Sequence, residues 1–287
     1  KVCEVKNCYF HDNMKSCIFF EGALSNFLLI QSTFANIATS SSEYMSVVDV
    51  RNANYAIINH CTFYNCQAMN TDHAAIKLEC DGLIANSVIV APESHGAYRA
   101  IHVKDGWNVE AKNCLSFNYT KDSGGFRSAV KKVDCLMNTD PLFVDAVNGN
   151  FSFAVGSPAL ASGTNGTNMG DLRWNPSDID DGIAYDFPSE DIPVEDEDSV
   201  EVIPTGKKLY VSPEGNNNND GLTPATAKAT FANVVSAALA GDTIIMADGL
   251  YSEAYVINFE QLGVVVMAAE GAKPVIQLTG NWTSLQL

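Results

Sequence analysis

Basic residues are scarce in this chain, and charged residues are few overall. Only 18% of the 287 residues are charged, and 17 Lys and Arg stand against 34 Asp and Glu, for a formal net charge of −17. A typical soluble domain has about 25% charged residues. Proteins that bind nucleic acid without sequence specificity neutralise its phosphates with a basic surface. The scarcity of Lys and Arg therefore excludes a nucleic-acid partner of that kind.

Long apolar runs are also missing. A membrane-spanning helix needs about 20 consecutive apolar residues, and the longest runs here, such as residues 263–269, are far shorter. We therefore expect no transmembrane segment. The chain has no Cys-x-x-Cys pair either, so its eight cysteines give no sign of a zinc site. With 46% hydrophobic residues, the chain can nevertheless bury a substantial core.

The negative charge is concentrated in one stretch. Eleven Asp and Glu lie between Pro176 and Glu201, where there is no Lys or Arg, and four prolines fall between Pro176 and Pro204. This composition is typical of a solvated, disordered segment. We interpret residues 176–206 as an acidic linker.

A calcium site is the alternative interpretation of that stretch. Carboxylate oxygens are suitable ligands for Ca²⁺, and the candidate ligands are Asp178, Asp180 and Asp181. Their spacing lacks the glycine and the terminal Glu of a known calcium-binding loop.

An internal repeat organises the first half of the chain. Five short segments of alternating apolar residues each lead to a polar anchor, and a second alternating strand follows after an interval. The anchors are 24, 29, 26 and 27 residues apart: Asn7, Gln31, His60, Asn86 and Asn113. Parallel strands need a crossover, and no helical pattern lies between these segments. The repeat therefore predicts a coil whose successive turns supply the crossover and hydrogen-bond to one another at about 4.8 Å.

The anchors predict the bends of this coil, because Asn tolerates the left-handed conformation that a bend between two strands requires. We expect His60 to be such a bend residue rather than a ligand. In the fifth segment Phe117 comes one residue later than the aromatic position of the other segments, which predicts a β-bulge. The expected interior columns are Cys8, Ser32, Cys61, Ser87 and Cys114; Phe10, Phe34, Phe63 and Ile89; and Ile18, Phe20, Val48, Val50, Ile76, Leu78, Ile101 and Val103. We interpret the cysteines as small buried residues rather than as disulfides or metal ligands.

Two further stretches carry motifs of a known fold. Residues 140–174 contain Asp-Pro-Leu-Phe-Val-Asp, Asn-Gly-Asn-Phe, Gly-Ser-Pro-Ala and Met-Gly-Asp, and residues 208–251 contain Lys-Leu-Tyr-Val-Ser-Pro, Asn-Asp-Gly, Gly-Asp-Thr-Ile and Asp-Gly-Leu-Tyr. With the repeat, they make the chain resemble a right-handed parallel β-helix of the pectate-lyase-like superfamily. More narrowly, it is similar to secreted bacterial β-helix proteins linked to polysaccharide use, many of unknown function. The first stretch resembles the segment that closes such helices, and the second resembles the segment that opens one.

The resemblance implies an all-β fold, a right-handed parallel β-helix with a short capping helix in the C-terminal segment. It also implies a polysaccharide or oligosaccharide partner and a secreted, periplasmic or cell-surface location in a bacterium. Lyases of this superfamily typically use a basic residue to take the proton beside the carboxylate of a uronic acid. Ca²⁺ often helps to neutralise that carboxylate.

The order of the parts is unusual. Residues 1–175 hold the repeats and the closing segment, residues 176–206 are the linker, and residues 207–287 resemble an opening segment. Within the last part, residues 230–240 read as an amphipathic helix that covers an open end, with Phe231, Val234, Val235 and Leu239 on its inner side. Either residues 207–287 begin a second β-helix, or they fold back to cap the turns that begin at Lys1. We favour the first arrangement.

One face of the predicted coil has a dense mixture of charges. The residues that point outward from the second strand stack into two columns: Phe19, Asp49, Lys77 and His102; and Glu21, Arg51, Glu79 and Lys104. As a saccharide-binding face, it would use Asp49, Arg51, Lys77, Glu79, Arg99, His102 and Lys104. The weak catalytic candidates are Lys77, Arg51 and His102. The alternative is a structural charge ladder, because the second column alternates in sign from turn to turn, and neighbouring acids disfavour Lys77 as a base.

An apolar column stands on another face. Leu28, Ile57 and Leu83 would point outward from the first strand, where a solvated sheet would be polar. We predict that either residues 138–174 or a partner protein covers this Leu28/Ile57/Leu83 face.

Three functions follow from the sequence. The first is a non-catalytic carbohydrate-binding or surface module, which the lack of a complete catalytic set favours. The second is a polysaccharide lyase that acts on uronic-acid-containing glycans by β-elimination. The third is a structural or adhesive repeat protein. Whether the chain is an enzyme stays open.

Overall fold

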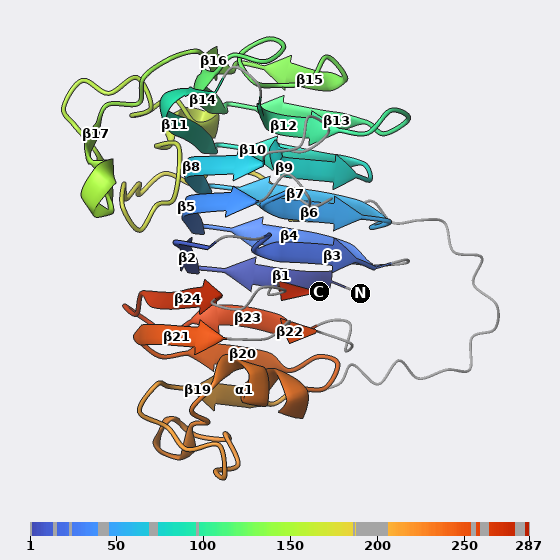
Figure 1. Ribbon diagram of the computed structural model, residues 1–287, viewed down its shortest axis with the longest axis vertical. Helices are drawn as coiled ribbons and strands as arrows, with labels where there is room; N and C mark the ends of the chain where they lie inside the picture. The colour runs from blue at the N-terminus through green and yellow to red at the C-terminus, as the bar shows by residue number, and fades with distance from the viewer. Residues whose placement is uncertain are drawn as a thin grey trace.

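The protein is a parallel β-solenoid whose backbone runs through three stacks of strands (Figure 1). The computed structural model describes residues 2–13, 16–22, 25–39, 46–68, 74–95, 98–185, 187, 206–253, 257–258, 264–278 and 285–286. Within these residues the three sheets contain nine, eight and six parallel strands. The all-β fold class and the parallel solenoid that the repeat predicts are confirmed.

The strands of each sheet lie in the following spatial order, in which neighbours are hydrogen-bonded to each other. Sheet A contains β15 (Val130–Val133), β13 (Val109–Lys112), β10 (Gly82–Ala85), β7 (Tyr55–Asn59), β4 (Asn26–Ile30), β1 (Val2–Lys6), β23 (Val265–Ala268), β20 (Thr243–Met246) and β19 (Lys208–Val211). Sheet B contains β16 (Leu136–Met137), β14 (Leu115–Tyr119), β11 (Val88–His95), β8 (Thr62–Ala68), β5 (Thr33–Thr39), β2 (Tyr9–His11), β24 (Pro274–Leu278) and β21 (Gly249–Glu253). Sheet C contains β12 (Arg99–Val103), β9 (Ala74–Glu79), β6 (Val48–Arg51), β3 (Ile18–Glu21), β25 (Leu285–Gln286) and β22 (Ile257–Asn258).

The interior is built from the columns that the alternation predicts. Phe34 stacks on Phe10 and on Phe63 with ring centroids 4.8 and 4.7 Å apart and nearly parallel planes, so one aromatic column runs through three turns. The inward residues of β3, β6, β9 and β12 are fully buried. All eight cysteines are free thiols, and seven of them are buried. The interpretation of the cysteines as small core residues is therefore confirmed.

The bends between sheets A and B lie at the predicted anchors. Asn7, Gln31, His60, Asn86 and Asn113 have φ values of 58°, 46°, 50°, 48° and 49°, all in the left-handed region. A sixth bend, which the repeat did not predict, lies at Asp134, with φ 50°. That turn lacks the alternating pattern of the others because β15 has two consecutive lysines between its valines and β16 is only two residues long.

The predicted bulge lies just beyond Phe117. Ser116 pairs with Ile89 and is buried, and Phe117 pairs with Val90. The register between β11 and β14 then shifts, and the next pair is His95 with Tyr119. The inward position of the fifth turn is taken by Ser116, whose hydroxyl donates to the carbonyl of Gly124 at 2.6 Å. Phe117 points outward and packs on the closing segment.

The C-terminal segment stacks on the first turn of the repeats. β23 pairs with β1, β24 with β2 and β25 with β3, all in parallel, and the two chain ends lie close together in Figure 1. Our preference for a separate second β-helix is therefore wrong, and the structure has the fold-back arrangement. The reason is that β1, β2 and β3 would otherwise leave an open edge of unpaired backbone groups beside an apolar interior.

The helix α1 (Phe231–Ala237) packs at the outer end of this C-terminal segment, beside β19 (Figure 1). Phe231, Val234 and Val235 are buried, as predicted, but Leu239 is 59% exposed. The expectation for Leu239 is wrong because the helix ends at Ala237 and Ala238 is extended. A short 3₁₀ turn, η3 (Pro224–Thr226), precedes the helix.

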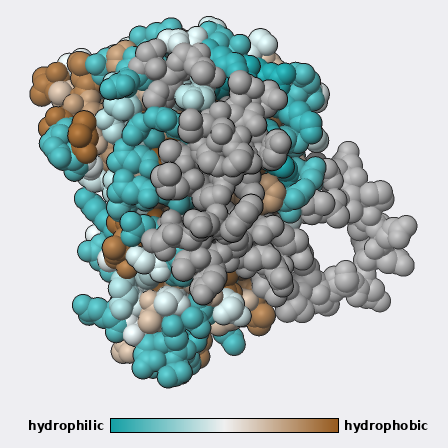
Figure 2. Space-filling view, viewed as in Figure 1, coloured by the Kyte–Doolittle hydropathy of each residue, from teal (hydrophilic) through white to brown (hydrophobic). Residues whose placement is uncertain are grey.

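The closing segment covers the outer face of sheet B. It begins with an antiparallel hairpin of β17 (Phe143–Asp145) and β18 (Asn150–Phe153), joined by η1 (Ala146–Asn148), and later contains η2 (Thr164–Gly166). Phe151 and Met169 pack against Tyr64, Val88 and neighbouring outward residues of sheet B. Some apolar side chains of this segment stay exposed, Val147 at 76%, and Figure 2 shows apolar atoms gathered where Figure 1 draws β17.

Hydrogen bonds clamp the closing segment along the bends of successive turns. The guanidinium of Arg173 donates to the carbonyls of Asn7 and Cys8 at 2.5 and 2.8 Å and to the carboxylate of Asp171 at 2.6 Å. Asp171 is fully buried and also accepts from the hydroxyl of Thr33 at 2.6 Å. One short stretch of chain thus ties together turns that are far apart in the sequence.

Replacing Arg173 should weaken this clamp. Arg173→Ala leaves the Asp171 carboxylate buried without its cation, so we expect the free energy of unfolding in urea to fall by about 3–5 kcal/mol. Arg173→Ala/Asp171→Asn should recover part of the loss, because it removes the uncompensated charge. The exposed pair of Lys131 and Glu110 provides a control, since Lys131→Ala should cost less than about 1 kcal/mol. Equal losses for Arg173→Ala and Lys131→Ala would contradict the clamp.

The fold-back arrangement predicts that the chain can be cut without separating its parts. A protease recognition sequence inserted between residues 190 and 203 allows cleavage of the folded protein. We expect the two fragments to elute together in size-exclusion chromatography, because one strand pair in each of the three sheets joins them. They should separate only above the urea midpoint of unfolding. Separation in native buffer would show that residues 206–287 do not stack on β1, β2 and β3.

Candidate functional site

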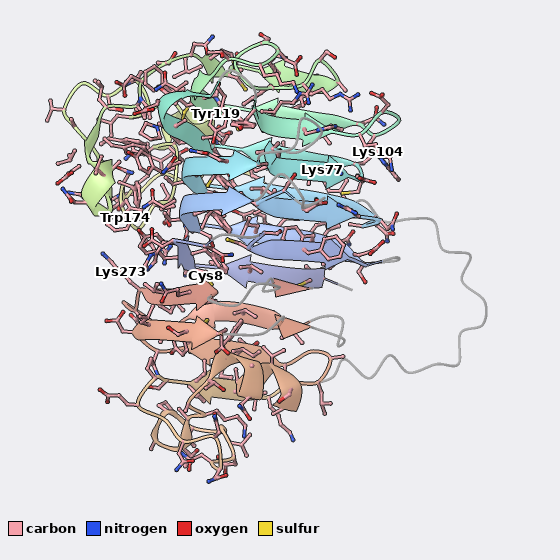
Figure 3. The ribbon with its side chains drawn as sticks, in the orientation of Figure 1. Cys8, Lys77, Lys104, Tyr119, Trp174 and Lys273 are labelled. Carbon is pink, nitrogen blue, oxygen red and sulfur yellow. The ribbon has the colours of Figure 1, made fainter. Side chains whose placement is uncertain are left out.

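The outer face of sheet C carries the two predicted columns in register. Phe19 pairs with Asp49 and Glu21 with Arg51, and on the next turns Asp49 pairs with Lys77 and Lys77 with His102. Lys77 and Lys104 come from successive turns of this sheet (Figure 3). Because side chains alternate along a strand, the strand that fills the core with Val48 and Val50 necessarily presents Asp49 on this face.

Asp49 and Arg51 form the first fixed pair of the face. Arg51 donates to both carboxylate oxygens of Asp49, from Nε at 2.8 Å and from Nη2 at 2.9 Å. Its guanidinium also lies 5.1 Å from the centroid of the Phe19 ring. Hydrogen bonding to Asp49 raises the pKa of Arg51 above its ordinary value. Asp49 is fully buried and also accepts from the backbone N–H of Ser46 at 3.1 Å.

Glu79 joins two lysines from two turns. Its Oε1 lies 2.7 Å from Nζ of Lys77, and its Oε2 accepts from Nζ of Lys104 at 2.7 Å. Burial by itself raises the pKa of Glu79, but the hydrogen bonds from Lys104 and Lys77 and their positive charges outweigh it and lower the pKa to about 2. Glu79 is therefore firmly ionised and holds one ammonium group at each of its oxygens.

His102 lies in a second group of charges at the upper part of the face. Nη1 of Arg127 lies 2.8 Å from Nε2 of His102, and Nη2 of Arg127 donates to Asp105 at 3.0 Å. A guanidinium can only donate, so Nε2 of His102 is the acceptor and the imidazole carries its proton on Nδ1. Arg99 pairs instead with Asp122. Arg99 is thus adjacent to the columns but engaged with a loop beside them.

Arg127 and Asp122 also contact candidate residues of this face, although the repeat did not predict them. Phe126 forms a bridge with Ile101, so Arg127 continues sheet C by one more turn. The sequence gives little indication of this turn, because Phe126 is the only inward residue of an alternating pattern around Arg127.

The candidate calcium ligands are arranged differently from the prediction. Asp181 is buried against the bend residues, where its Oδ2 accepts from Nδ2 of Asn59 at 2.6 Å and lies 3.1 Å from Nε2 of His60. Burial lowers the pKa of His60, and the carboxylate of Asp181 opposes this shift. Among the residues that the structure describes, which include Asp178, Asp180 and Asp181, no three His, Cys, Asp or Glu side chains come together as a possible metal site. Asp178, Asp180 and Asp181 are thus not gathered into one cluster of three ligands in this structure, and Asp181 is not part of a solvated linker.

The apolar face of sheet A is covered from within the chain. Leu28, Ile57 and Leu83 are in register on successive turns, and Ile57 is only 2% exposed. Phe187, from the acidic stretch, packs against Leu28 and Ile57. Leu28 and Ile57 are thus covered, as predicted, but by Phe187 rather than by residues 138–174, and Leu83 stays partly exposed. A single aromatic residue within an acidic stretch gave too little pattern to be recognised.

Comparison with known proteins adds no family to this description. No family model, no curated protein and no solved structure matches the chain. No described helix has the length and apolar character needed to cross a membrane.

The Glu79 cluster predicts a specific dependence of stability on pH. A carboxyl whose pKa is depressed in the folded state contributes stability above its ordinary pKa of about 4.5, and this contribution is lost as the pH falls toward 2. The wild-type protein should therefore lose more stability between pH 4.5 and pH 2 than Glu79→Gln does. Chemical denaturation across this range measures the difference.

The matched control for this prediction is Glu110→Gln, which removes the carboxylate of the Lys131–Glu110 pair on sheet A. It should retain the wild-type pH dependence, because Glu79 and its two lysines are still in place. Parallel curves for Glu79→Gln and the wild type would disprove the role of Glu79.

Proposed function

We propose that the protein is a non-catalytic, polysaccharide-interacting module that uses the outer face of sheet C. The observation that supports this function is that every basic candidate of the face is held in a fixed pair. Arg51 is bound by Asp49, Lys77 and Lys104 by Glu79, and His102 by Arg127. Such groups recognise a ligand without taking a proton from it.

The spacing of the face suits an extended polymer. Neighbouring turns repeat their donors and acceptors at about 4.8 Å along the solenoid. A polysaccharide presents hydroxyl groups repeatedly along its length, and ion-paired carboxylates and ammonium groups can still accept from and donate to them. The pairs Asp49–Arg51 and Glu79–Lys104 are pre-organised, so little side-chain entropy is lost on binding. The exposed Nζ of Lys104 and the guanidinium of Arg51 are the accessible donors.

A lyase reaction on this face is less well supported by the geometry. A base that removes a proton beside a uronate must itself be deprotonated near neutral pH. Glu79 stabilises the ammonium of Lys77, Asp49 raises the pKa of Arg51, and Arg127 occupies the lone pair of His102. None of the three catalytic candidates is thus prepared to act as a base.

The resemblance of the repeat to pectate-lyase-like β-helix proteins supports the same proposal. It suggests a protein that acts outside the cytoplasm, on the cell surface, in the periplasm or in the medium of a bacterium. A purely structural or adhesive role is the alternative if the alternating charges of Glu21, Arg51, Glu79 and Lys104 serve only to hold the sheet together.

Binding measurements with a matched pair of variants test the proposal. We expect affinity electrophoresis in gels that contain polygalacturonate, alginate, cellulose derivatives or galactomannan to retard the wild-type protein with at least one polymer. Lys104→Ala should weaken that retardation about three- to tenfold, as expected for the loss of one solvent-exposed hydrogen bond. Lys131→Ala is the control, because Lys131 forms the equivalent exposed pair with Glu110 on sheet A, with N···O 2.6 Å.

Two results would contradict the proposal. Retardation that is unchanged by Lys104→Ala would place the binding elsewhere, and no retardation by any polymer would favour the structural role. An increase in the ultraviolet absorbance of unsaturated uronate in the same mixtures would show that the protein is a lyase.

A further inference from the structure

A cavity of about 540 Å³ opens at the junction between the C-terminal segment and the first repeat turn. Its lining includes Asn7 and Gln31 from the bends, Arg173 from the closing segment, and residues 267–273. This volume lies within the range of about 300–1,000 Å³ that small-ligand sites occupy. The cavity is remote from the face of sheet C in the fold, because the bends join sheets A and B.

Two local features create this cavity. The bend between β1 and β2 has only two residues, whereas five residues, 269–273, connect β23 to β24. The longer connection projects beyond the line of bends and forms a ledge. The hydrogen-bonded clamp of the closing segment ends at the bend beside this ledge, where Arg173 donates to the carbonyls of Asn7 and Cys8. The bends above are covered by the closing segment, and the ledge below is not.

The hydrogen bonds of the bend residues differ in the same way. The side chain of Asn86 accepts from the backbone N–H of Thr164 at 2.7 Å, and that of Asn113 accepts from the Thr164 hydroxyl at 3.1 Å. Asn7 lines the cavity, and its buried Oδ1 has no hydrogen-bond donor among the described residues. An unsatisfied buried acceptor is costly, so the bend at Asn7 is less well satisfied than the bends at Asn86 and Asn113.

The lining of the cavity carries opposite charges, and one of these charged groups contacts an aromatic ring beside the cavity. Nζ of Lys273 lies 4.9 Å from the centroid of the Trp174 ring, and Figure 3 shows the two side chains at the same side of the stack. Lys273 has no acidic partner among the described residues, while Glu270 provides a carboxylate on the same ledge. The charge of Arg173 is already neutralised by Asp171. The lining therefore offers donors and acceptors in balance above the apolar atoms of Met267 and Ala268.

We infer that this cavity is a binding site for an uncharged sugar unit. A sugar ring has an apolar face and hydroxyl groups that both donate and accept, which matches an apolar floor with carboxamides, a carboxylate and an ammonium around it. A phosphate or another anion would need more positive charge than this lining offers, because Asp171, behind the lining, neutralises Arg173, and Glu270 offsets Lys273. The inference extends the proposed polysaccharide function to a second site, and it rests on that function only for the source of the sugar.

Trp174 itself can report on this site. A Trp107→Phe/Trp282→Phe protein leaves Trp174 as the only tryptophan, because the chain has three. We expect cellohexaose or mannohexaose to change the fluorescence of Trp174, because a sugar in the cavity displaces Lys273 or contacts the indole. Hexagalacturonate should bind more weakly, because Glu270 repels its carboxylates.

Variants of the ledge complete the test. In the same single-tryptophan background, Ala272→Arg fills the cavity and should weaken binding of the neutral hexasaccharide about tenfold or more. Glu270→Gln should weaken it by less, about threefold, because an amide still accepts one hydrogen bond. The control is Ala225→Arg, which fills a separate polar hollow of about 240 Å³ in the opening segment and should leave binding unchanged.

The outcomes separate this site from the face of sheet C. A Trp174 response that Ala272→Arg abolishes and Lys104→Ala leaves intact supports the cavity, even if the sheet C proposal fails. Polymer retardation that depends on Lys104, with no Trp174 response to any neutral sugar, overturns the cavity and leaves the sheet C proposal standing. Tighter binding of hexagalacturonate than of the neutral sugars also overturns the inference, because it would show an anion site.

Discussion

The structure depends on the hydrogen bonding of each turn of backbone to the turns beside it. In a parallel solenoid every strand satisfies its N–H and C=O groups with strands that are a whole turn away in the sequence. This requirement fixes the register of the sheets, and the register in turn stacks like positions into columns. It also explains the unusual path of the chain. The open edge formed by β1, β2 and β3 is satisfied by β23, β24 and β25, although these strands come from the other end of the sequence.

The stacking gives the two sides of each strand different roles. Inside, Phe10, Phe34 and Phe63 form a continuous aromatic column that excludes water from the backbone hydrogen bonds. Outside, the same register brings acids and bases of neighbouring turns within hydrogen-bond distance. Glu79 meets a lysine of its own turn and one of the next. The charges of sheet C thus support the fold, and among them Lys104 and Arg51 keep exposed side-chain surface.

The closing segment divides the outer surface into covered and open parts. It lies over sheet B and along the bends, and Asp171 and Arg173 fasten it to turns that begin far from it in the sequence. Where the segment ends, the bend at Asn7 is left without the side-chain partners that Asn86 and Asn113 have. The cavity lies at this bend, beside the longer connection of residues 269–273.

The sequence by itself determined the features that recur with its own period. The inward columns, the left-handed bends at Asn7 to Asn113, the outward columns of sheet C and the helix that begins at Phe231 all follow from alternation or local propensity. Only the tertiary structure decided which distant segments meet. It placed β23 beside β1, Phe187 on Leu28 and Ile57, Asp181 on His60, and Lys273 on Trp174. These contacts join segments that share no periodic pattern, so the repeat does not predict them. They form because each one covers an open strand edge, an apolar face or a buried polar group.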